Sequence, residues 1–185
     1  CHRMDALKVA RQLLDGEITA DDLLASLSGV PDLTETEILA LSAHALERSH
    51  SIPRKGWSVA LVAQAAIRRL PNTCLQSQVA LDLVETLISC ERYNHALDSL
   101  DALQPALAEV GSVVLHGRWA WLRGLAHSRM ARAGEAAQSL ATAGPLVRQA
   151  DSPHEIMRWQ CDLARVKMLQ AEYDEALALA QLSLD

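Results

Sequence analysis

Cysteine and histidine are the residue types here that could support nucleophilic or metal chemistry. Cys90 lies five residues before His95, and Cys161 lies seven residues after His154, so each could form a thiol–imidazole pair. The seven histidines form no HxxxH or HExxH motif, and the four cysteines form no CxxC motif. Zinc sites and reactive thiols depend on such arrangements. We therefore expect packed thiols, with no metal, no cofactor and no catalytic residue, so not an enzyme.

Charge is the second chemical signal, and it is unevenly distributed. The chain has 17 Lys and Arg against 23 Asp and Glu, a net charge of −6. Residues 113–170 nevertheless hold eight basic side chains against four acidic ones, whereas residues 71–112 hold one against six. A cluster of arginines suits recognition of a carboxylate or an acidic peptide, because the guanidinium fork matches a carboxylate. The alternative is that these arginines are solvated surface charges, some paired with neighbouring acids.

The composition argues against several classes of protein. The acidic balance does not fit the basic surface of a nucleic-acid-binding protein. No apolar run approaches the length of a membrane span, and the first residues do not read as a signal peptide. Scattered cysteines are typical of reduced cytosolic proteins. We expect a cytoplasmic protein whose partner is neither a membrane nor a nucleic acid.

The elements that would position these residues repeat every 40 residues. A similar short segment contains Ala96, Ala136 and Ala176, and one further step back falls on Gly56. Self-similarity at a fixed period of this size predicts stacked repeats. Half of the residues are apolar, Phe is absent, and Ala and Leu provide most of the apolar mass, as in helix-on-helix packing. The sequence thus predicts an all-α stack of antiparallel helix pairs.

Apolar spacing sets the approximate bounds of these helices. First helices are expected at about 36–49, 76–90, 114–131 and 154–170, and second helices at about 55–70, 94–109, 134–149 and 174–185. The repeats would then span about 34–72, 73–112, 113–152 and 153–185. Thr34 with Glu37 and Ser152 with Glu155 have the spacing of capping boxes. Residues 1–33 lie outside the register and suggest two short helices, 4–14 and 20–27, forming an N-terminal cap or a linker.

Three segments resemble the helix-start motif of the tetratricopeptide repeat: Tyr173-Asp174-Glu175-Ala176-Leu177, Tyr93-Asn94-His95-Ala96-Leu97 and Ala133-Gly134-Glu135-Ala136-Ala137. The small residue of the first helix is Gly124 and Ala164 in the last two units, but Val84 and His44 in the earlier ones. The usual period is 34 residues, and a 40-residue form is similar to the long repeats of bacterial multidomain signalling regulators. The resemblance implies a right-handed superhelical solenoid.

The resemblance also implies a concave groove lined by the first helices. Carried over by register, the residues of its C-terminal half are Arg118, Trp121, Leu125, Arg129, Arg158 and Arg165. The preceding unit would contribute Leu81, Glu85 and Ile88. If the arginines do not bind the partner, an apolar groove around Leu81, Ile88, Trp121 and Leu125 is the alternative site.

The resemblance implies a non-catalytic scaffold or sensor module of a larger bacterial regulatory protein, acting in signalling or transcription control. Its partner would be a protein or peptide, acidic if the arginines bind it, or another domain of the same polypeptide. Two alternatives remain. One is the regulatory arm of an enzyme whose catalytic domain lies outside this chain, and the other is a soluble chaperone that holds a client.

The last expected helix, 174–185, is apolar nearly all round. A terminal repeat normally has a polar outer face. We therefore expect Leu177, Leu182 and Leu184 to be covered by sequence beyond Asp185, which implies a truncated C-terminus, or by another chain. A homo-oligomer formed through this helix is one such arrangement.

Overall fold

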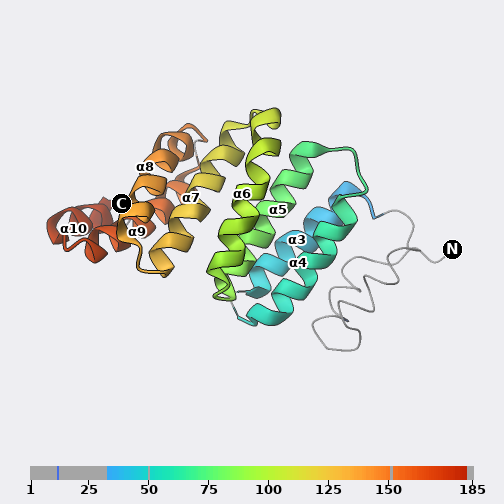
Figure 1. Ribbon diagram of the computed structural model, residues 1–185, viewed down its shortest axis with the longest axis horizontal. Coiled ribbons are helices and arrows are strands. Elements are labelled where there is room, and N and C mark those ends of the chain that lie inside the picture. Colours follow the sequence, from blue (N-terminus) through green and yellow to red (C-terminus); the bar gives the residue numbers. More distant parts are fainter. Residues whose placement is uncertain (1–11, 13–32, 50, 151, 183–185) are drawn as a thin grey trace. The chain divides into compact units, whose positions relative to one another are not determined.

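The computed structural model describes Gln12 and residues 33–49, 51–150 and 152–182 (Figure 1). This part of the chain forms eight α-helices and no strand. Every helix expected within it is present, with ends that differ from the expected positions by three residues or fewer. The short helices expected at 4–14 and 20–27, and Leu184, lie outside the described residues. The helices belong to two compact units, which divide between Arg92 and Tyr93.

The first unit contains α3 (Glu35–Ser49), α4 (Pro53–Ile67) and α5 (Thr73–Ser89). Helices α3 and α4 form a hairpin, and α5 packs against both of them (Figure 1). Its core consists of aliphatic side chains that are at most 1% exposed: Ile38, Leu41, Val59, Val62, Ile67, Val79 and Leu81. A buried hydrogen bond of 2.5 Å from Ser42 Oγ to Asp82 Oδ2 joins α3 to α5.

The second unit contains α6 (Tyr93–Val110), α7 (Val113–Arg129), α8 (Ala133–Gln149), α9 (Pro153–Leu169) and α10 (Tyr173–Leu182). Helices α7 and α8 form one hairpin and α9 and α10 another, while α6 packs on α7 and α9 on α8. A buried cluster joins α7, α8 and α9 and consists of Ala120, Trp121, Ala136, Leu140, Ala143, Val147, Trp159 and Val166. First and second helices therefore alternate along the stack, as the period predicts.

Helix starts recur with the same period. The first helices α5, α7 and α9 are capped by Asn72, Ser112 and Ser152, each accepting a hydrogen bond from the backbone N–H three residues on. At the start of α3, the Thr34 N–H donates to Glu37 Oε2 at 2.8 Å and the Glu37 N–H donates to Thr34 Oγ1 at 3.3 Å. The capping box predicted at Thr34 is thus confirmed.

The turns that end the first helices recur as well. Glu91, Ala131 and Ala171 lie 40 residues apart and adopt the left-handed conformation, with φ of 61°, 57° and 61°. The N–H of the following residue then donates to a carbonyl five residues back: Arg92 to Leu87, Arg132 to His127 and Glu172 to Lys167, at 2.9, 3.0 and 2.9 Å. This pattern is the Schellman motif that ends a helix. Because these turns share the motif, Arg92, Arg132 and Glu172 have equivalent local backbone conformations.

Gly56 shows why a small residue suits this position of the second helix, and it predicts a stability effect. A Cβ at Gly56 would lie 2.7 Å from both the Ala45 carbonyl oxygen and the Ser49 amide nitrogen. Because these are backbone atoms, they cannot rotate away. We predict that Gly56→Ala lowers the free energy of unfolding by about 2–3 kcal/mol, measured by urea denaturation. Gly134→Ala is the matched control, since a Cβ added at Gly134 would meet nothing within 4 Å; equal losses for both variants would contradict the account.

Candidate functional site

Trp121 and three of the four predicted arginines meet on the second unit, where the first helices α7 and α9 lie side by side. The Trp121 side chain of α7 donates its Nε1–H to Asp162 Oδ2 of α9 at 2.9 Å. This bond links successive hairpins across a separation of 41 residues. We call the group formed by Trp121, Arg129, Arg158, Asp162 and Arg165 the Trp121 cluster.

Helical spacing explains how α9 supplies three members of the cluster. Arg158, Asp162 and Arg165 are separated by four and three residues, so they share one face of the helix. The Arg158 guanidinium carbon lies 5.0 Å from the centre of a Trp121 ring, which is cation–π geometry. Arg165 Nη1 lies 3.9 Å from Asp162 Oδ1. One carboxylate therefore sits between an indole and two guanidinium groups.

The electrostatics of Asp162 reflect its position. Burial raises the pKa of the carboxyl above its usual value of 3.8, because the charged form loses hydration. The hydrogen bond from Trp121 and the charges of Arg165, Arg158 and Arg129 act in the opposite direction on that pKa. The Asp162 carboxylate thus holds Trp121 in place through the hydrogen bond. The carboxylate loses hydration on burial, and the charges of the three arginines offset this loss in part.

The Trp121 cluster has more positive than negative charge. Arg129 is exposed and forms no ion pair with any residue that the structure describes. The Arg165 side chain is 47% exposed, and its contact with Asp162 is long, so most of its donors face solvent. Even without counting Arg158, the charges of Arg129 and Arg165 against Asp162 leave an excess of one positive charge. This arrangement can bind an anion by charge and by forked hydrogen bonds.

The other predicted site residues lie elsewhere. Arg118 and Leu125 are partly buried on α7. Leu81, Glu85 and Ile88 belong to the first unit and are 0%, 5% and 6% exposed. The structure therefore brings Trp121 together with Arg129, Arg158 and Arg165, and it places the three residues of α5 among buried side chains.

Asp162 is the member of the cluster that the sequence analysis missed. The repeat register could have identified Asp162, because Asp82 occupies the same position two 40-residue periods earlier. Asp82 also accepts a hydrogen bond from the preceding first helix, through Ser42. An acidic residue at this register position therefore marks a contact between adjacent first helices.

Two neighbouring tryptophans of α7 point to different partners. Trp119 donates its Nε1–H to the Leu100 carbonyl of α6 at 2.8 Å, whereas Trp121 faces Asp162 of α9. Trp159, 40 residues after Trp119, makes the equivalent bond to the Leu140 carbonyl at 3.0 Å. Trp119 and Trp159 are therefore repeated packing anchors, which leaves Trp121 as the tryptophan of the candidate site.

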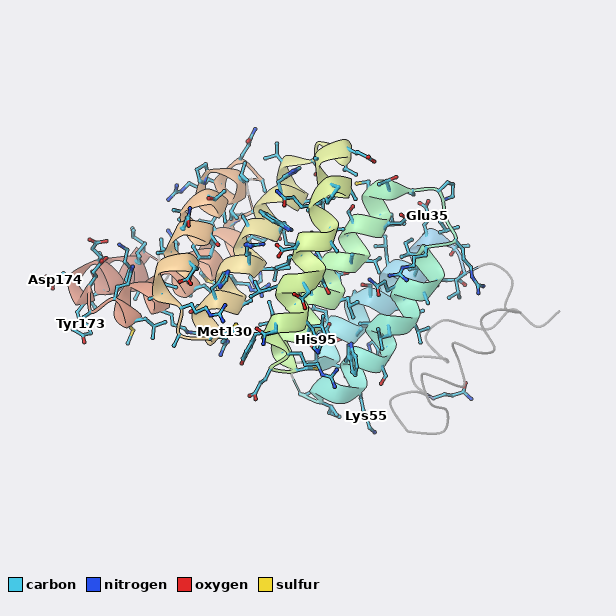
Figure 2. The ribbon with its side chains drawn as sticks, viewed as in Figure 1. Glu35, Lys55, His95, Met130, Tyr173 and Asp174 are labelled. Carbon is cyan, nitrogen blue, oxygen red and sulfur yellow. The ribbon has the colours of Figure 1, made fainter. Side chains whose placement is uncertain are left out.

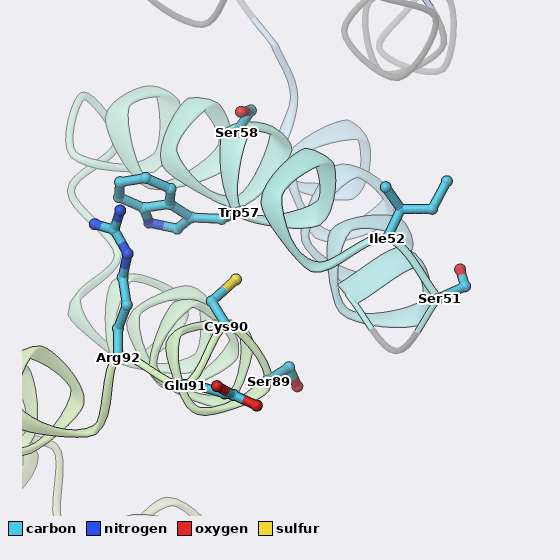
Figure 3. A pocket seen from close by; sticks show the side chains of 8 residues that line it. All are labelled: Ser51, Ile52, Trp57, Ser58, Ser89, Cys90, Glu91 and Arg92. Atoms are coloured by element: carbon cyan, nitrogen blue, oxygen red, sulfur yellow. The ribbon is translucent and has the colours of Figure 1, made fainter.

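A cavity of about 780 Å³ lies in the first unit, at the ends of its helices (Figure 3). It is lined by Ser51, Ile52, Trp57, Ser58, Ser89, Cys90, Glu91 and Arg92. The Arg92 guanidinium carbon lies 4.0 Å from the centre of a Trp57 ring. The sequence analysis did not identify this feature, because its walls come from a turn and two helix ends rather than from one helical face.

Buried His127 predicts a pH dependence of stability. It is 8% exposed, and its Nδ1 has no hydrogen-bond partner among the described residues. Burial chiefly lowers the pKa of its imidazole below 6.5; Arg123 and Arg132 add to this, while Glu135 and Asp101 oppose it. Because the unfolded chain takes up a proton at this group more readily than the folded chain, acidification favours unfolding.

We predict that the free energy of unfolding falls more steeply for the native protein than for His127→Leu between about pH 7.5 and about pH 5. Leucine is the residue at the equivalent position 87, so the variant has a precedent within the chain. Denaturant unfolding at several pH values measures the difference. Parallel curves for the two proteins would show that His127 is not responsible.

The exposed surface of α10 includes large apolar side chains beside Asp174 and Glu175. Leu177 and Leu182 are each 59% exposed, whereas Ala176 is 6% exposed against α9. Tyr173, at the beginning of α10, is 66% exposed (Figure 2). Covering of this helix by another chain or by further sequence stays a prediction.

Two further observations bear on membrane insertion and on metal binding. Within the described ranges, no helix is both long enough and apolar enough to cross a bilayer. The same residues contain no group of three or more His, Cys, Asp or Glu side chains arranged to hold a metal ion.

Comparison with known proteins supports the fold. No family model matches the chain, and no curated protein matches it in sequence. The crystal structure of the apo form of RapI is similar, with a TM-score of 0.66 and 15% sequence identity. The match covers 96% of this chain and 48% of RapI, so the chain spans about half the length of that protein. At this identity the likeness concerns the fold, which is an all-α solenoid of helical repeats.

Proposed function

We propose that this chain is a non-catalytic binding module whose Trp121 cluster holds an acidic segment of a protein or peptide. The observation that carries the proposal is the convergence of three arginines on one carboxylate, in a protein whose net charge is −6. Surplus positive charge on an acidic protein is electrostatically complementary to an acidic partner.

Each member of the cluster has a part in this binding. Stacking on Trp121 restricts the Arg158 guanidinium before a ligand arrives, so less conformational entropy is lost on binding. Arg129 and Arg165 present exposed donors to a carboxylate of the partner. Asp162 holds Trp121 in position and limits the repulsion among the arginines.

The proposal is tested with a fluorescein-labelled peptide rich in Asp and Glu and a matched peptide in which Asn and Gln replace them. Fluorescence anisotropy should show binding of the acidic peptide, with an affinity that decreases as salt is added because exposed charges are screened. The amide peptide should bind much more weakly. Equal binding of both peptides would contradict the proposal.

The wider role that we propose is a sensor or scaffold module of a cytoplasmic bacterial regulatory protein, built from long tetratricopeptide-like repeats. The 40-residue recurrence of caps and turns and the motif beginning at Tyr173 support this family. The partner segment would come from a separate protein or from another domain of the same polypeptide. A repeat module of this kind presents a surface to a partner and performs no chemistry itself.

A further inference from the structure

The cavity of the first unit contains a guanidinium group that stacks on an indole and has no anionic partner among the described residues. Arg92 is exposed, stacks on Trp57, and forms no ion pair within the described part of the chain. In a stacked arginine the N–H donors lie in the plane of the group and point outward from the ring. Arg92 is therefore arranged to receive a carboxylate at its edge.

The repeat register shows that this arrangement is particular to the first unit. Arg132 occupies the position of Arg92 one period later, also exposed and also following a left-handed residue. The position of Trp57 is taken there by Leu97, and in the following repeat by Ala137. The arginine is thus repeated at this turn. The aromatic side chain that restrains Arg92 is replaced by Leu97 at the corresponding position for Arg132.

The remaining walls of the cavity provide an apolar surface beside the guanidinium. Figure 3 shows Cys90 near the stacked Trp57 and Arg92 side chains, whereas the Ile52 side chain lies farther along the lining and points away from Trp57. The indole and the Cys90 side chain are therefore the apolar surface next to the guanidinium. A volume of about 780 Å³ is within the range of sites for small organic ligands.

Glu91, the acidic residue that lines the cavity, does not pair with the Arg92 guanidinium. Figure 3 shows the Glu91 side chain directed toward Ser89 and away from the Arg92 guanidinium and Trp57. The left-handed backbone at Glu91, with φ of 61°, separates the directions of these two successive side chains. The edge of Arg92 therefore remains open to an anion from outside.

We infer that this cavity binds a carboxylate that carries an aromatic or branched aliphatic group, with the carboxylate on Arg92 and the apolar group beside Trp57 and Cys90. Such a ligand is either a free organic acid or a carboxylate of a peptide. The inference does not depend on the Trp121 cluster, which belongs to the other unit.

Isothermal titration with two pairs of probes tests this inference. The first pair is N-acetyl-phenylalanine and its amide, and the second is a tetrapeptide ending in phenylalanine with a free or an amidated C-terminus. We expect the acid of at least one pair to bind at least about tenfold more tightly than its amide, because an ionic hydrogen bond is lost in the amide. Binding of the small acid indicates a free organic acid, and binding of the tetrapeptide alone indicates a peptide carboxylate. No binding of either acid, or equal binding of acid and amide, would overturn the inference.

Variants then assign the preference to Arg92. Arg92→Gln should abolish the preference for acid over amide, and Arg92→Lys should retain part of it, because a lysine keeps the charge but not the fork. Arg132→Gln is the matched control and should leave the preference unchanged. Arg158→Glu with Arg165→Glu should also leave it unchanged, which separates this site from the one proposed above. An equal loss in Arg92→Gln and Arg132→Gln would refute the assignment.

Discussion

Replacing Trp159 with alanine should lower the free energy of unfolding of the second unit by about 3–5 kcal/mol, the cost typical of removing a buried aromatic side chain. Trp159 is 3% exposed. Its ring packs so tightly on α8 that a Cβ at Gly144 would lie 2.6 Å from it. The ring also donates a hydrogen bond to the Leu140 carbonyl and lies 4.8 Å from the Arg148 guanidinium carbon. The variant would leave a large cavity between α8 and α9.

Two further variants separate the contributions to this loss. Trp159→Phe keeps most of the aromatic volume but removes the Nε1–H, so we expect a loss nearer about 1–2 kcal/mol. Trp119→Ala removes the equivalent side chain one period earlier, which is only partly buried, and should cost less than Trp159→Ala. Guanidinium denaturation followed by circular dichroism measures all three. A loss in Trp159→Ala no larger than that in Trp119→Ala would contradict the packing described here.

Local and periodic features of this protein were predictable from its sequence. Helix ends depend on nearby residues, such as Thr34 with Glu37, whose capping bonds form within a single turn. The helix pairing follows from a small residue at a fixed position, and Gly56 shows the reason because its neighbours are backbone atoms of α3. A 40-residue recurrence makes such signals visible several times, so the all-α repeat fold could be inferred.

Features that join different elements were harder to predict. The partner of Trp121 depends on how α9 packs beside α7, which no spacing within one helix determines. The stack of Arg92 on Trp57 joins a turn to a different helix, 35 positions apart in the chain. Leu81 and Ile88 were assigned to a groove by register, but their burial depends on everything that surrounds α5. Sequence reasoning therefore located the arginines and Trp121, but not the Asp162 carboxylate that joins them.

Reversing two charges of the Trp121 cluster should produce the largest effect on binding. In Arg158→Glu with Arg165→Glu, two attractive contacts with an acidic partner become repulsive. If each contact contributes about 1.5–3 kcal/mol, their loss weakens binding by at least about 100-fold. Asp162→Asn should have the opposite effect and tighten binding, because the excess positive charge of the cluster rises while the amide oxygen can still accept the Trp121 hydrogen bond.

A matched double variant controls for the overall change in charge. Arg68→Glu with Arg132→Glu alters the net charge by the same amount at two exposed positions outside the cluster. Circular dichroism spectra and unfolding midpoints should confirm that both double variants fold. Reversals at exposed positions such as Arg165, Arg68 and Arg132 usually change stability by about 0.5 kcal/mol or less, whereas Arg158 is partly buried against Trp121 and its reversal should cost more.

The dissociation constant of the acidic peptide, measured by fluorescence anisotropy for the native protein and both double variants, tests the central claim most directly. We predict that Arg158→Glu with Arg165→Glu abolishes binding, whereas Arg68→Glu with Arg132→Glu changes the dissociation constant severalfold at most through long-range electrostatics. Equal losses in the two double variants, or unchanged binding in the first, would contradict a binding site at the Trp121 cluster.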